Sequence, residues 1–306
     1  MATDEQVRSY GDSSIKQDVF PLIEILTAKE SFLLNNLGKT TAISTIHQTQ
    51  TDTLRTAASQ AVGEGGDYTD LARTTPTLLT NVVEIIAVPF SVTRTQQQVA
   101  HFSGENELTR QTQKALSEWA NAAEFDIWRS TLTSGASGTA PKMSGLIEAV
   151  SKAANHTSHT SGTNFVASIL KGLMKDVIDN GNGEAVTDLF LGSYLKTVFD
   201  GFTAGQTKYW ESDVKTLTDA VNVYDSGAFG LVRAHFHRYI QQSGDATGRV
   251  MGINMDNLKI SFLERPFIDT DLARSGDYDR RAVVGKLTLE VRNQDTNTFA
   301  DGFWIG

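Results

Sequence analysis

A long, uninterrupted helical pattern over residues 103–132 constrains the fold more than any other stretch. No proline or glycine interrupts residues 105–134, so the pattern predicts one helix of roughly 40 Å. Ser103 is the expected N-cap, and Glu105 and Glu107 are acids in the expected first turn, where the helix dipole favours negative charge. The predicted packing face is rich in small residues and consists of Leu108, Thr112, Ala115, Leu116, Trp119, Ala122 and Ala123.

Two aromatic side chains near the end of this helix, Phe125 and Trp128, point away from that face. A helix that is apolar on a second side is expected to touch a second body. Two interpretations stay open: an ordinary long core helix, or a helix that also meets another subunit. Under the second interpretation, Phe125 and Trp128 are candidate intersubunit contacts.

Composition limits the classes of function. The 306 residues suffice for one large domain or two ordinary ones. The absence of cysteine excludes disulfides, thiolate metal sites and cysteine nucleophiles. A formal net charge of -9 argues against broad binding of nucleic acid, although not against a protein that surrounds nucleic acid without gripping it. Residues 1–14 lack the apolar core of a signal peptide and no apolar run is long enough to span a membrane, so we expect a protein made in the cytoplasm.

Residues 40–102 do not have the composition of a self-sufficient domain. Twelve threonines occur between positions 40 and 80, and threonine favours strands over helices. Two strand-like runs, 42–54 and 82–95, flank a glycine-rich acidic tip. The second run alternates, with Ile86, Val88, Phe90 and Val92 on one face, and Pro89 predicts either a sheet edge or an irregular ladder. Such a segment cannot bury a core of its own. It is either a flexible insertion or an arm that becomes ordered on a neighbouring subunit. In the second case its charged residues are candidate intersubunit contacts: Arg55, Glu64, Asp67 and Arg73.

No motif for nucleotide binding or catalysis is found. The run 38–41, G-K-T-T, lacks the glycine that a P-loop places five residues before its Gly-Lys pair, where this chain has Leu33. The chain also lacks G-x-S-x-G and H-E-x-x-H. Carboxylates between positions 264 and 279 alternate with arginines and therefore predict an ion-pair surface rather than an acid–base site. We expect no catalytic residue, no bound metal and no cofactor.

Two histidine pairs could ligate a metal but have a simpler explanation. His156 and His159 fall in a polar segment, 155–162, that reads as a loop without a third ligand, so we expect them to face solvent. His235 and His237 fall on the polar face of an alternating strand within 229–240. We expect that face to contact solvent or a neighbour.

A compact α/β region is expected to begin at the turn cluster 134–141. Residues 164–180 predict an amphipathic helix with Gly181 as its C-cap. Residues 187–191 predict a buried strand, followed by a short helix that begins near Ser193. Further strands are expected at 221–224, 250–254, 258–262, 282–292 and 299–305.

Four short runs and the order of the parts carry a family resemblance. The runs are G-K-T-T-A leading to H-Q-T-Q-T-D-T-L, over 38–54, and D-L-A-R-S-G-D leading to L-T-L-E-V-R-N, over 271–293. The order is a polar N-terminal arm, an extended two-stranded loop, a long spine helix, an α/β domain and long terminal strands. Nearly the whole chain resembles the major capsid proteins of tailed double-stranded DNA bacteriophages.

This resemblance implies an α+β capsid fold and a structural role. Copies of the chain would assemble as hexamers and pentamers into an icosahedral virion shell around double-stranded DNA, in the bacterial host cytoplasm and without sequence-specific DNA binding. Scaffold, portal and decoration proteins are the implied partners, and no membrane is involved. The implied domains are an arm and first helix (1–39), the extended loop (40–102), the spine helix of a peripheral domain (103–142), an axial domain (143–270) and the terminal strands of the peripheral domain (271–306).

Two features of some family members can be compared with this sequence. No lysine lies between Lys39 and Lys114, which excludes an isopeptide bond from a lysine in the middle of the extended loop. Fewer than twenty residues precede the first apolar helix pattern near Pro21, so we expect no long scaffolding segment. Either a separate scaffold exists or this is the processed form.

Two other classes of function remain as alternatives. One is an oligomeric α/β enzyme or ligand-binding protein, which needs a clustered site that the motifs do not supply. The other is a different virion part, such as a decoration or tail-tube protein. Those are usually all-β and lack so long a helix.

Overall fold

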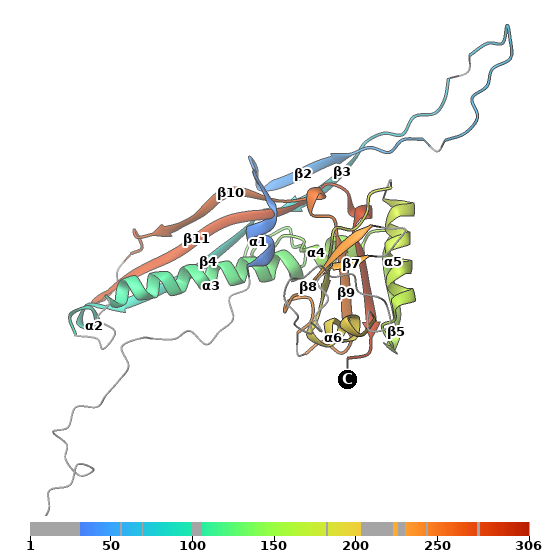
Figure 1. Ribbon diagram of the computed structural model, residues 1–306. Coiled ribbons are helices and arrows are strands. Elements are labelled where there is room, and N and C mark those ends of the chain that lie inside the picture. Colours follow the sequence, from blue (N-terminus) through green and yellow to red (C-terminus); the bar gives the residue numbers. More distant parts are fainter. Residues whose placement is uncertain are drawn as a thin grey trace, which may run out of the picture.

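The computed structural model describes residues 31–55, 57–68, 70–99, 106–181, 183–202, 223–225, 230–242, 244–273 and 276–305. Two sheets form the body of the chain, and a two-stranded hairpin projects from it (Figure 1). The expected helix near Pro21 and the polar stretch 205–219 lie outside the described residues. No helix among the described residues is long and apolar enough to cross a membrane.

The first sheet has four strands in the order β1-β10-β11-β4. Its strands are β1 (Gly38–Thr41), β10 (Leu258–Asp269), β11 (Tyr278–Val291) and β4 (Glu84–Thr93). β1 runs parallel to β10, and the other pairs are antiparallel. The G-K-T-T run is therefore a strand and not a phosphate-binding loop. β4 lies at the edge, as Pro89 predicts, because proline has no N–H to donate to a second neighbour.

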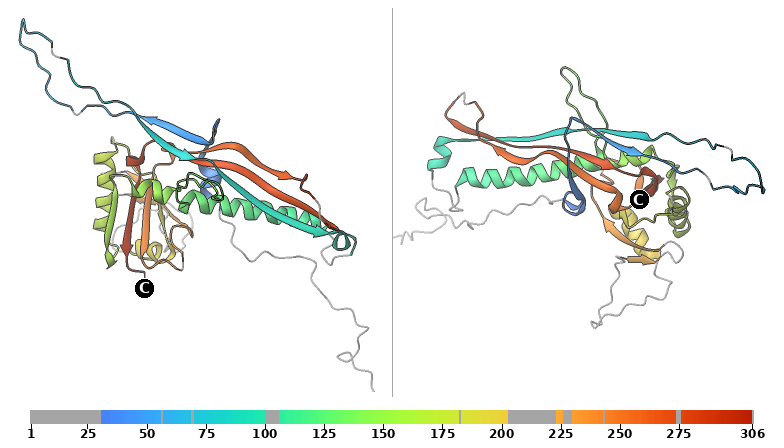
Figure 2. Two further views of the ribbon diagram at one scale, coloured as in Figure 1. Left: turned by 180° about the vertical axis from the view of Figure 1, so that it is seen from behind. Right: turned by 90° about the horizontal axis from the view of Figure 1, so that it is seen from above.

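The long helix α3 (Glu107–Arg129) runs along one face of this sheet (Figure 2). Its N-cap is Asn106, whose side chain accepts from the backbone N–H of Leu108 at 2.9 Å. Ser103, the expected N-cap, lies outside the described residues, and the helix is shorter than the predicted range 103–132. Small residues on the packing face let the backbones approach closely. Trp119 lies against Gly285 of β11 and donates from its indole to the carbonyl of Ile86 at 3.1 Å.

The predicted packing face of α3 is confirmed at its centre, where Ala115, Trp119 and Ala123 are buried. Leu116, also expected on that face, is exposed instead. The buried stripe continues through Ile127 toward the end of the helix. The buried face of α3 therefore shifts around the helix axis along its length, because the first part packs on the four-stranded sheet and the last part on the six-stranded sheet.

The second sheet has six strands in the order β5-β12-β9-β6-β8-β7. They are β5 (His156–Thr163), β12 (Thr298–Phe303), β9 (Gly248–Ile253), β6 (Asp188–Leu191), β8 (Leu231–Phe236) and β7 (Val223–Asp225). One face shares a core with α5 (Ala167–Asn180) and α6 (Ser193–Phe202). The other face shares a core with α3, α1 (Phe32–Asn36) and α4 (Leu146–Ser151). The predicted C-cap of α5, Gly181, is confirmed.

One expectation for this region was wrong. The segment 155–162, expected as a loop, is strand β5, which pairs in parallel with β12. Its polar composition is that of an edge strand, and alternation of serine, threonine and histidine gives no apolar period to read.

The implied division between an axial domain and terminal peripheral strands at 270/271 also does not follow the sheets. β10 belongs to the four-stranded sheet and β12 to the six-stranded one. The chain crosses between the sheets after β9, at η2 (Met255–Asn257), and after β11, at η3 (Gln294–Thr296). The sequence of a strand does not by itself predict which sheet the strand joins.

The hairpin consists of β2 (Ile46–Thr51) and β3 (Thr77–Val82), paired antiparallel. The expected second run, 82–95, was partly wrong: the chain leaves the hairpin at Val83 and enters β4, then forms the short helix α2 (Arg94–Gln98). The predicted alternation along β4 is confirmed, because Ile86 and Val92 are buried and Val88 and Phe90 half-buried, whereas their neighbours are exposed.

Candidate functional site

The tip of the hairpin lies away from the body of the chain. Every described residue from 52 to 78 is exposed, and Figure 1 shows this segment extending beyond β2 and β3. Strand pairing ends at Thr51 and Thr77, whose hydroxyls lie 2.9 Å apart. An isolated two-stranded element is at best marginally stable in water. The hairpin therefore has the geometry of an arm rather than of a folded unit.

All four charged candidates from the sequence, Arg55, Glu64, Asp67 and Arg73, lie on this tip and are exposed. Among the described residues, none of the four forms an ion pair or a side-chain hydrogen bond. Two large apolar side chains accompany them, Leu54 at 99% and Tyr68 at 93% exposure. The tip thus offers both charged and apolar groups that the described part of the chain leaves uncovered.

The root of the hairpin is held by polar contacts. The Asn81 amide nitrogen donates to the carbonyls of Ser144 at 3.1 Å and Leu289 at 2.8 Å. Its oxygen accepts from the backbone N–H of Ser144 at 2.7 Å and of Val82 at 2.8 Å. One side chain therefore ties β3 to the loop before α4 and to β11, and fixes where the hairpin leaves the body.

A second polar cluster at the root surrounds Glu290 of β11. Its carboxylate accepts from Thr40 at 3.2 Å, from Ser261 at 3.0 Å and from Arg292 at 2.9 Å, and it lies 3.2 Å from His47 Nε2. Burial alone would raise the pKa of Glu290, but the hydrogen bonds, led by that from Arg292, outweigh burial and hold the pKa below its ordinary value. The ionised carboxylate thus joins β1, β2, β10 and β11.

A pair of acids at the same root has the opposite electrostatic character. Glu84, the first residue of β4, is buried and accepts from Met143 N–H at 3.1 Å and Ser130 Oγ at 3.2 Å. Burial nevertheless raises its pKa. Burial, and then the charge of Glu84, raise the pKa of Asp126 on α3 from 3.8 to about 7, against the attraction of Lys142. A second negative charge therefore develops at this site only as the pH rises through about 7.

The two aromatic candidates on α3 meet a second body, but that body belongs to the same chain. Trp128 is fully buried, with its ring 5.1 Å from Phe190 of β6 and 4.7 Å from His237. The expectation that Trp128 contacts another subunit was wrong. Phe125 is half-buried and packs edge-on against Tyr239 at 5.5 Å. The second apolar side of α3 therefore joins the four-stranded layer to the six-stranded sheet.

Sequence reasoning missed a buried acid at this junction. Glu124 of α3 is fully buried, and its two oxygens accept from the first-turn backbone N–H groups of Leu33 at 2.9 Å and Leu34 at 2.8 Å. Ser31, the N-cap of α1, makes no side-chain cap bond. The carboxylate of Glu124, which belongs to α3, caps α1 in its place. Trp128 Nε1 also donates to it at 3.1 Å.

His237 completes this arrangement and corrects the expectation of a polar strand face. It is buried, and its Nε2 lies 3.1 Å from Glu124 Oε1 while its Nδ1 accepts from the N–H of Tyr239 at 3.2 Å. A ring nitrogen that accepts carries no proton, so the geometry assigns a neutral imidazole that donates through Nε2. Burial opposes the charge of Glu124, but the bonds from His237, Leu33 and Leu34 leave its pKa below the ordinary value.

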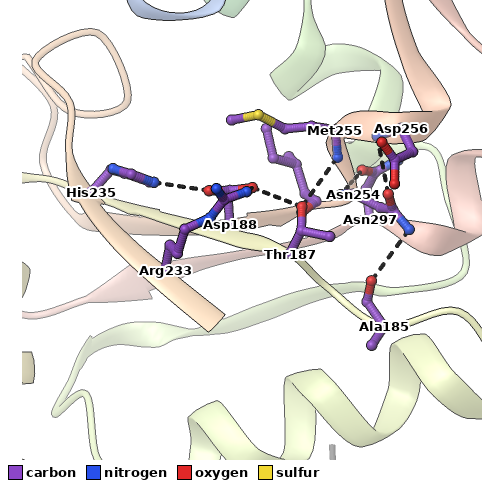
Figure 3. Close-up of polar contacts among 10 residues, drawn as sticks. Ala185, Thr187, Asp188, Arg233, His235, Asn254, Met255, Asp256 and Asn297 are labelled. Atoms are coloured by element: carbon purple, nitrogen blue, oxygen red, sulfur yellow. Dashed lines mark hydrogen bonds and ion pairs between the residues drawn. The ribbon is translucent and has the colours of Figure 1, made fainter. Parts of the chain in front are cut away.

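His235 is half-buried and lies with Asp188, not with His237. Its Nε2 is 2.8 Å from Asp188 Oδ1, and Arg233 donates to Oδ2 at 2.9 Å (Figure 3). Burial alone would raise the pKa of Asp188, but these bonds outweigh burial and leave the pKa below its ordinary value. The arrangement is an ion-pair cluster between β6 and β8.

The other histidine pair, His156 and His159, is half-buried on β5, and the rings pack on Phe299 and Phe303. The expectation that both face solvent was therefore wrong. Within the part of the chain that the structure describes, no group of three or more His, Cys, Asp or Glu side chains is arranged to hold a metal ion.

Comparisons with known proteins agree with the geometry. The model of a family described as SU10 major capsid protein matches residues 4–302. Among solved structures, the capsid of a native GTA particle computed with C5 symmetry is similar, with a TM-score of 0.69, 10% identity, and coverage of 97% of this chain and 98% of that chain. The holo-SrpI encapsulin complex from Synechococcus elongatus PCC 7942 is also similar. Its TM-score is 0.65 at 10% identity, with coverage of 98% of this chain and 97% of that chain.

A chain of Mycobacterium phage Adephagia gives a TM-score of 0.65 at 13% identity, with 98% of each chain covered. At such identities the likeness shows the fold, and the fold class predicted from the sequence is confirmed. No curated protein sequence matches the chain.

Proposed function

This chain belongs to the SU10 major capsid protein family, and we propose that it forms the icosahedral head shell of a tailed phage by assembling with copies of itself as hexamers and pentamers. The observation that carries the proposal is the projecting hairpin. The described residues from 52 to 78 are exposed and contact little of the described chain, so we infer that a neighbour orders them.

We assign the contacts with the neighbour to the tip. Leu54 and Tyr68 supply apolar area for the contact. The charged side chains determine the register of the arm on its neighbour more than the affinity of the contact; they are Arg55, Glu64, Asp67 and Arg73. Asn81 and Glu290 hold the root so that the arm leaves each copy in the same direction. Phe125 is half-buried by its own chain, and in the proposal it plays at most a peripheral part in the subunit contact.

The role is structural rather than catalytic in this proposal. A net charge of -9 suits an inner surface along which packaged DNA slides, because strong phosphate binding would hinder packing and ejection. Assembly in the bacterial host cytoplasm, with scaffold, portal and decoration proteins as partners, belongs to the same proposal. Many modest interfaces close the shell through avidity.

The test is to shorten the hairpin without removing its root. Thr51 and Thr77 are paired residues, so an Asn-Gly turn can replace residues 52–76 and close the hairpin with a favoured two-residue loop. We expect the parent to form closed shells, or rings of five and six, by negative-stain electron microscopy and sedimentation velocity. The shortened chain should keep its circular dichroism spectrum and its melting temperature but stay unassembled.

A milder variant separates the side chains of the tip from its length. Leu54→Ser with Tyr68→Ser removes the exposed apolar area and leaves the backbone intact. Thr53→Ser with Thr75→Ser is the matched control on the same exposed segment. Normal shells from the shortened chain would contradict the proposed role of the arm.

A further inference from the structure

Within the described residues, the two sheets are joined by an apolar core, by the buried bond between Glu124 and His237, and by two further directional polar contacts. The core runs from α3 and β11 into the six-stranded sheet through Phe190, Met251 and Ile253. Apolar packing is not directional, so on its own it tolerates small rotations of one layer over another. Hydrogen bonds to buried side chains fix direction as well as distance. The polar contacts therefore decide how sharply the angle between the sheets is defined.

The first polar contact lies where the chain crosses between the sheets, and we call it the asparagine joint. Asn254 follows β9 and Asn297 precedes β12, and both are buried. The Asn254 N–H donates to Asn297 Oδ1 at 3.0 Å, and the Asn297 amide nitrogen donates to the carbonyl of Asn293 at 3.1 Å. Arg292 N–H donates to the carbonyl of Asn257 at 2.9 Å, so the two crossings are bonded to each other.

The joint is tied to the middle of the six-stranded sheet (Figure 3). The Asn254 amide nitrogen donates to the carbonyl of Ala185 at 3.3 Å. The Met255 N–H donates to Thr187 Oγ1 at 3.2 Å, and that hydroxyl lies 2.7 Å from Asp188 Oδ2. The buried amides thus connect both crossings to the Asp188 cluster, and every link has a preferred direction.

The second polar contact, which we call the arginine clamp, ties α3 to the loop before β9. Arg129, in the last turn of α3, donates through both terminal nitrogens to Asp245, at 2.8 Å and 2.9 Å. Arg249 donates to the same carboxylate at 3.1 Å. The bond from Arg129 is the largest cause that lowers the pKa of Asp245 to about 2, so the clamp is charged throughout the neutral range. A two-pronged Arg–carboxylate pair fixes orientation as well as distance.

The joint and the clamp lie at opposite ends of β9, since Asn254 follows its last residue and Asp245 precedes its first. A six-residue strand spans roughly 20 Å, so a small displacement at either end rotates the six-stranded sheet against α3. We propose that the asparagine joint and the arginine clamp together set the angle between the two sheets, with Asn297 and Arg129 as positioning residues. That angle shapes the subunit and, on the proposed function, the curvature of the shell.

The test is a distance between the two sheets within one chain. The chain has no cysteine, so spin labels at Lys171→Cys on α5 and Ser91→Cys on β4 are unique, and both positions are exposed. Dipolar spectroscopy is recorded with labelled chains diluted into unlabelled ones, so that only distances within a chain contribute. We expect a single narrow distribution for the parent.

Asn297→Ala and Arg129→Gln should each shift and broaden the distribution, and the double variant should do so more. Arg129→Lys, which keeps the charge but loses the fork, should lie between parent and Arg129→Gln. Leu173→Ala, in the core between α5 and the sheet, lowers stability without touching either contact and should stay narrow. If Asn297→Ala does not fold, the distance distribution of Arg129→Gln still tests the proposal.

An unchanged distribution in both single variants, or a broad one in the parent, would overturn the inference. Electron microscopy of the same variants gives a separate readout, since a changed angle should widen the spread of shell diameters. Absence of shells from the parent would count against the proposed function but would leave the distance measurement valid.

Discussion

Replacing Asp126 by Asn gives the sharpest test of the electrostatics at the hairpin root. Asp126 lies on α3 near buried Glu84, which begins β4 and holds Ser130 and Met143. Burial and the charge of Glu84 raise the pKa of Asp126 from 3.8 to about 7. The substitution keeps the shape of the side chain and removes its ability to ionise.

The sign and size of the effect follow from linkage. Between the unfolded value of 3.8 and the folded value of about 7, the folded chain holds a proton that the unfolded chain has lost, so stability falls as pH rises. The full shift corresponds to about 4 kcal/mol at about 1.36 kcal/mol per unit. Asp126 is only half-buried, and solvent screening reduces this to roughly 1–2 kcal/mol. Asp126→Asn should therefore be more stable than the parent at pH 8 and equal to it near pH 4.

The assay is urea unfolding of the unassembled chain at several pH values from 4 to 8. Asp67→Asn, on the exposed hairpin tip, is the matched control because it changes net charge by the same amount. The difference between Asp126→Asn and the parent should grow with pH, whereas the control should not reproduce that growth. A constant difference across the range, or a variant less stable than the parent at pH 8, would refute the reasoning.

Two further substitutions test the packing of α3. Glu124→Gln keeps the size of the side chain but loses the charge that caps α1 at Leu33 and Leu34, and it should cost about 1–3 kcal/mol in urea unfolding; an unchanged midpoint would mean that the cap contributes nothing. Gly285→Ala places a Cβ into the ring of Trp119 and should cost about 1–3 kcal/mol. If overlap is the cause, the loss in the double variant Gly285→Ala with Trp119→Leu should be smaller than the sum of the losses of the two single variants.

The sequence alone predicted the elements whose patterns are local. Ala115, Trp119 and Ala123 recur at helical spacing, and they are buried. β4 was predicted by alternation, and its edge position by Pro89. The family resemblance predicted an extended arm, and the composition of residues 40–102 explained why that arm cannot fold alone.

The contacts between distant segments could not be predicted in the same way. Glu124 is separated from Leu33 by 91 residues and from His237 by 113, and no local pattern links positions so far apart. One available signal was an acid between Ala123 and Phe125 on a helix face that leads to Trp128. An acid among apolar residues indicates a buried partner, but does not name it.

The described acids with perturbed pKa values divide by the direction of the shift, and the division has a consequence for assembly. Glu124, Asp188, Asp245 and Glu290 have lowered pKa values and hold segments of the chain together, Glu290 at the hairpin root. Their contribution is fully present above the ordinary pKa and is lost only as pH falls below it, down to about 2 for Asp245. Around neutral pH these four carboxylates therefore stay ionised.

Glu84 and Asp126 are the described acids with raised pKa values, and both lie where the hairpin joins the body. A rise of pH through about 7 thus adds repulsion at the root of the arm while the ion pairs of the body stay intact. On the proposed function, the strength of subunit contacts should depend on pH near neutrality through the direction and rigidity of the arm, and not through unfolding of the subunit. Asp126→Asn should remove that dependence from assembly as it does from stability.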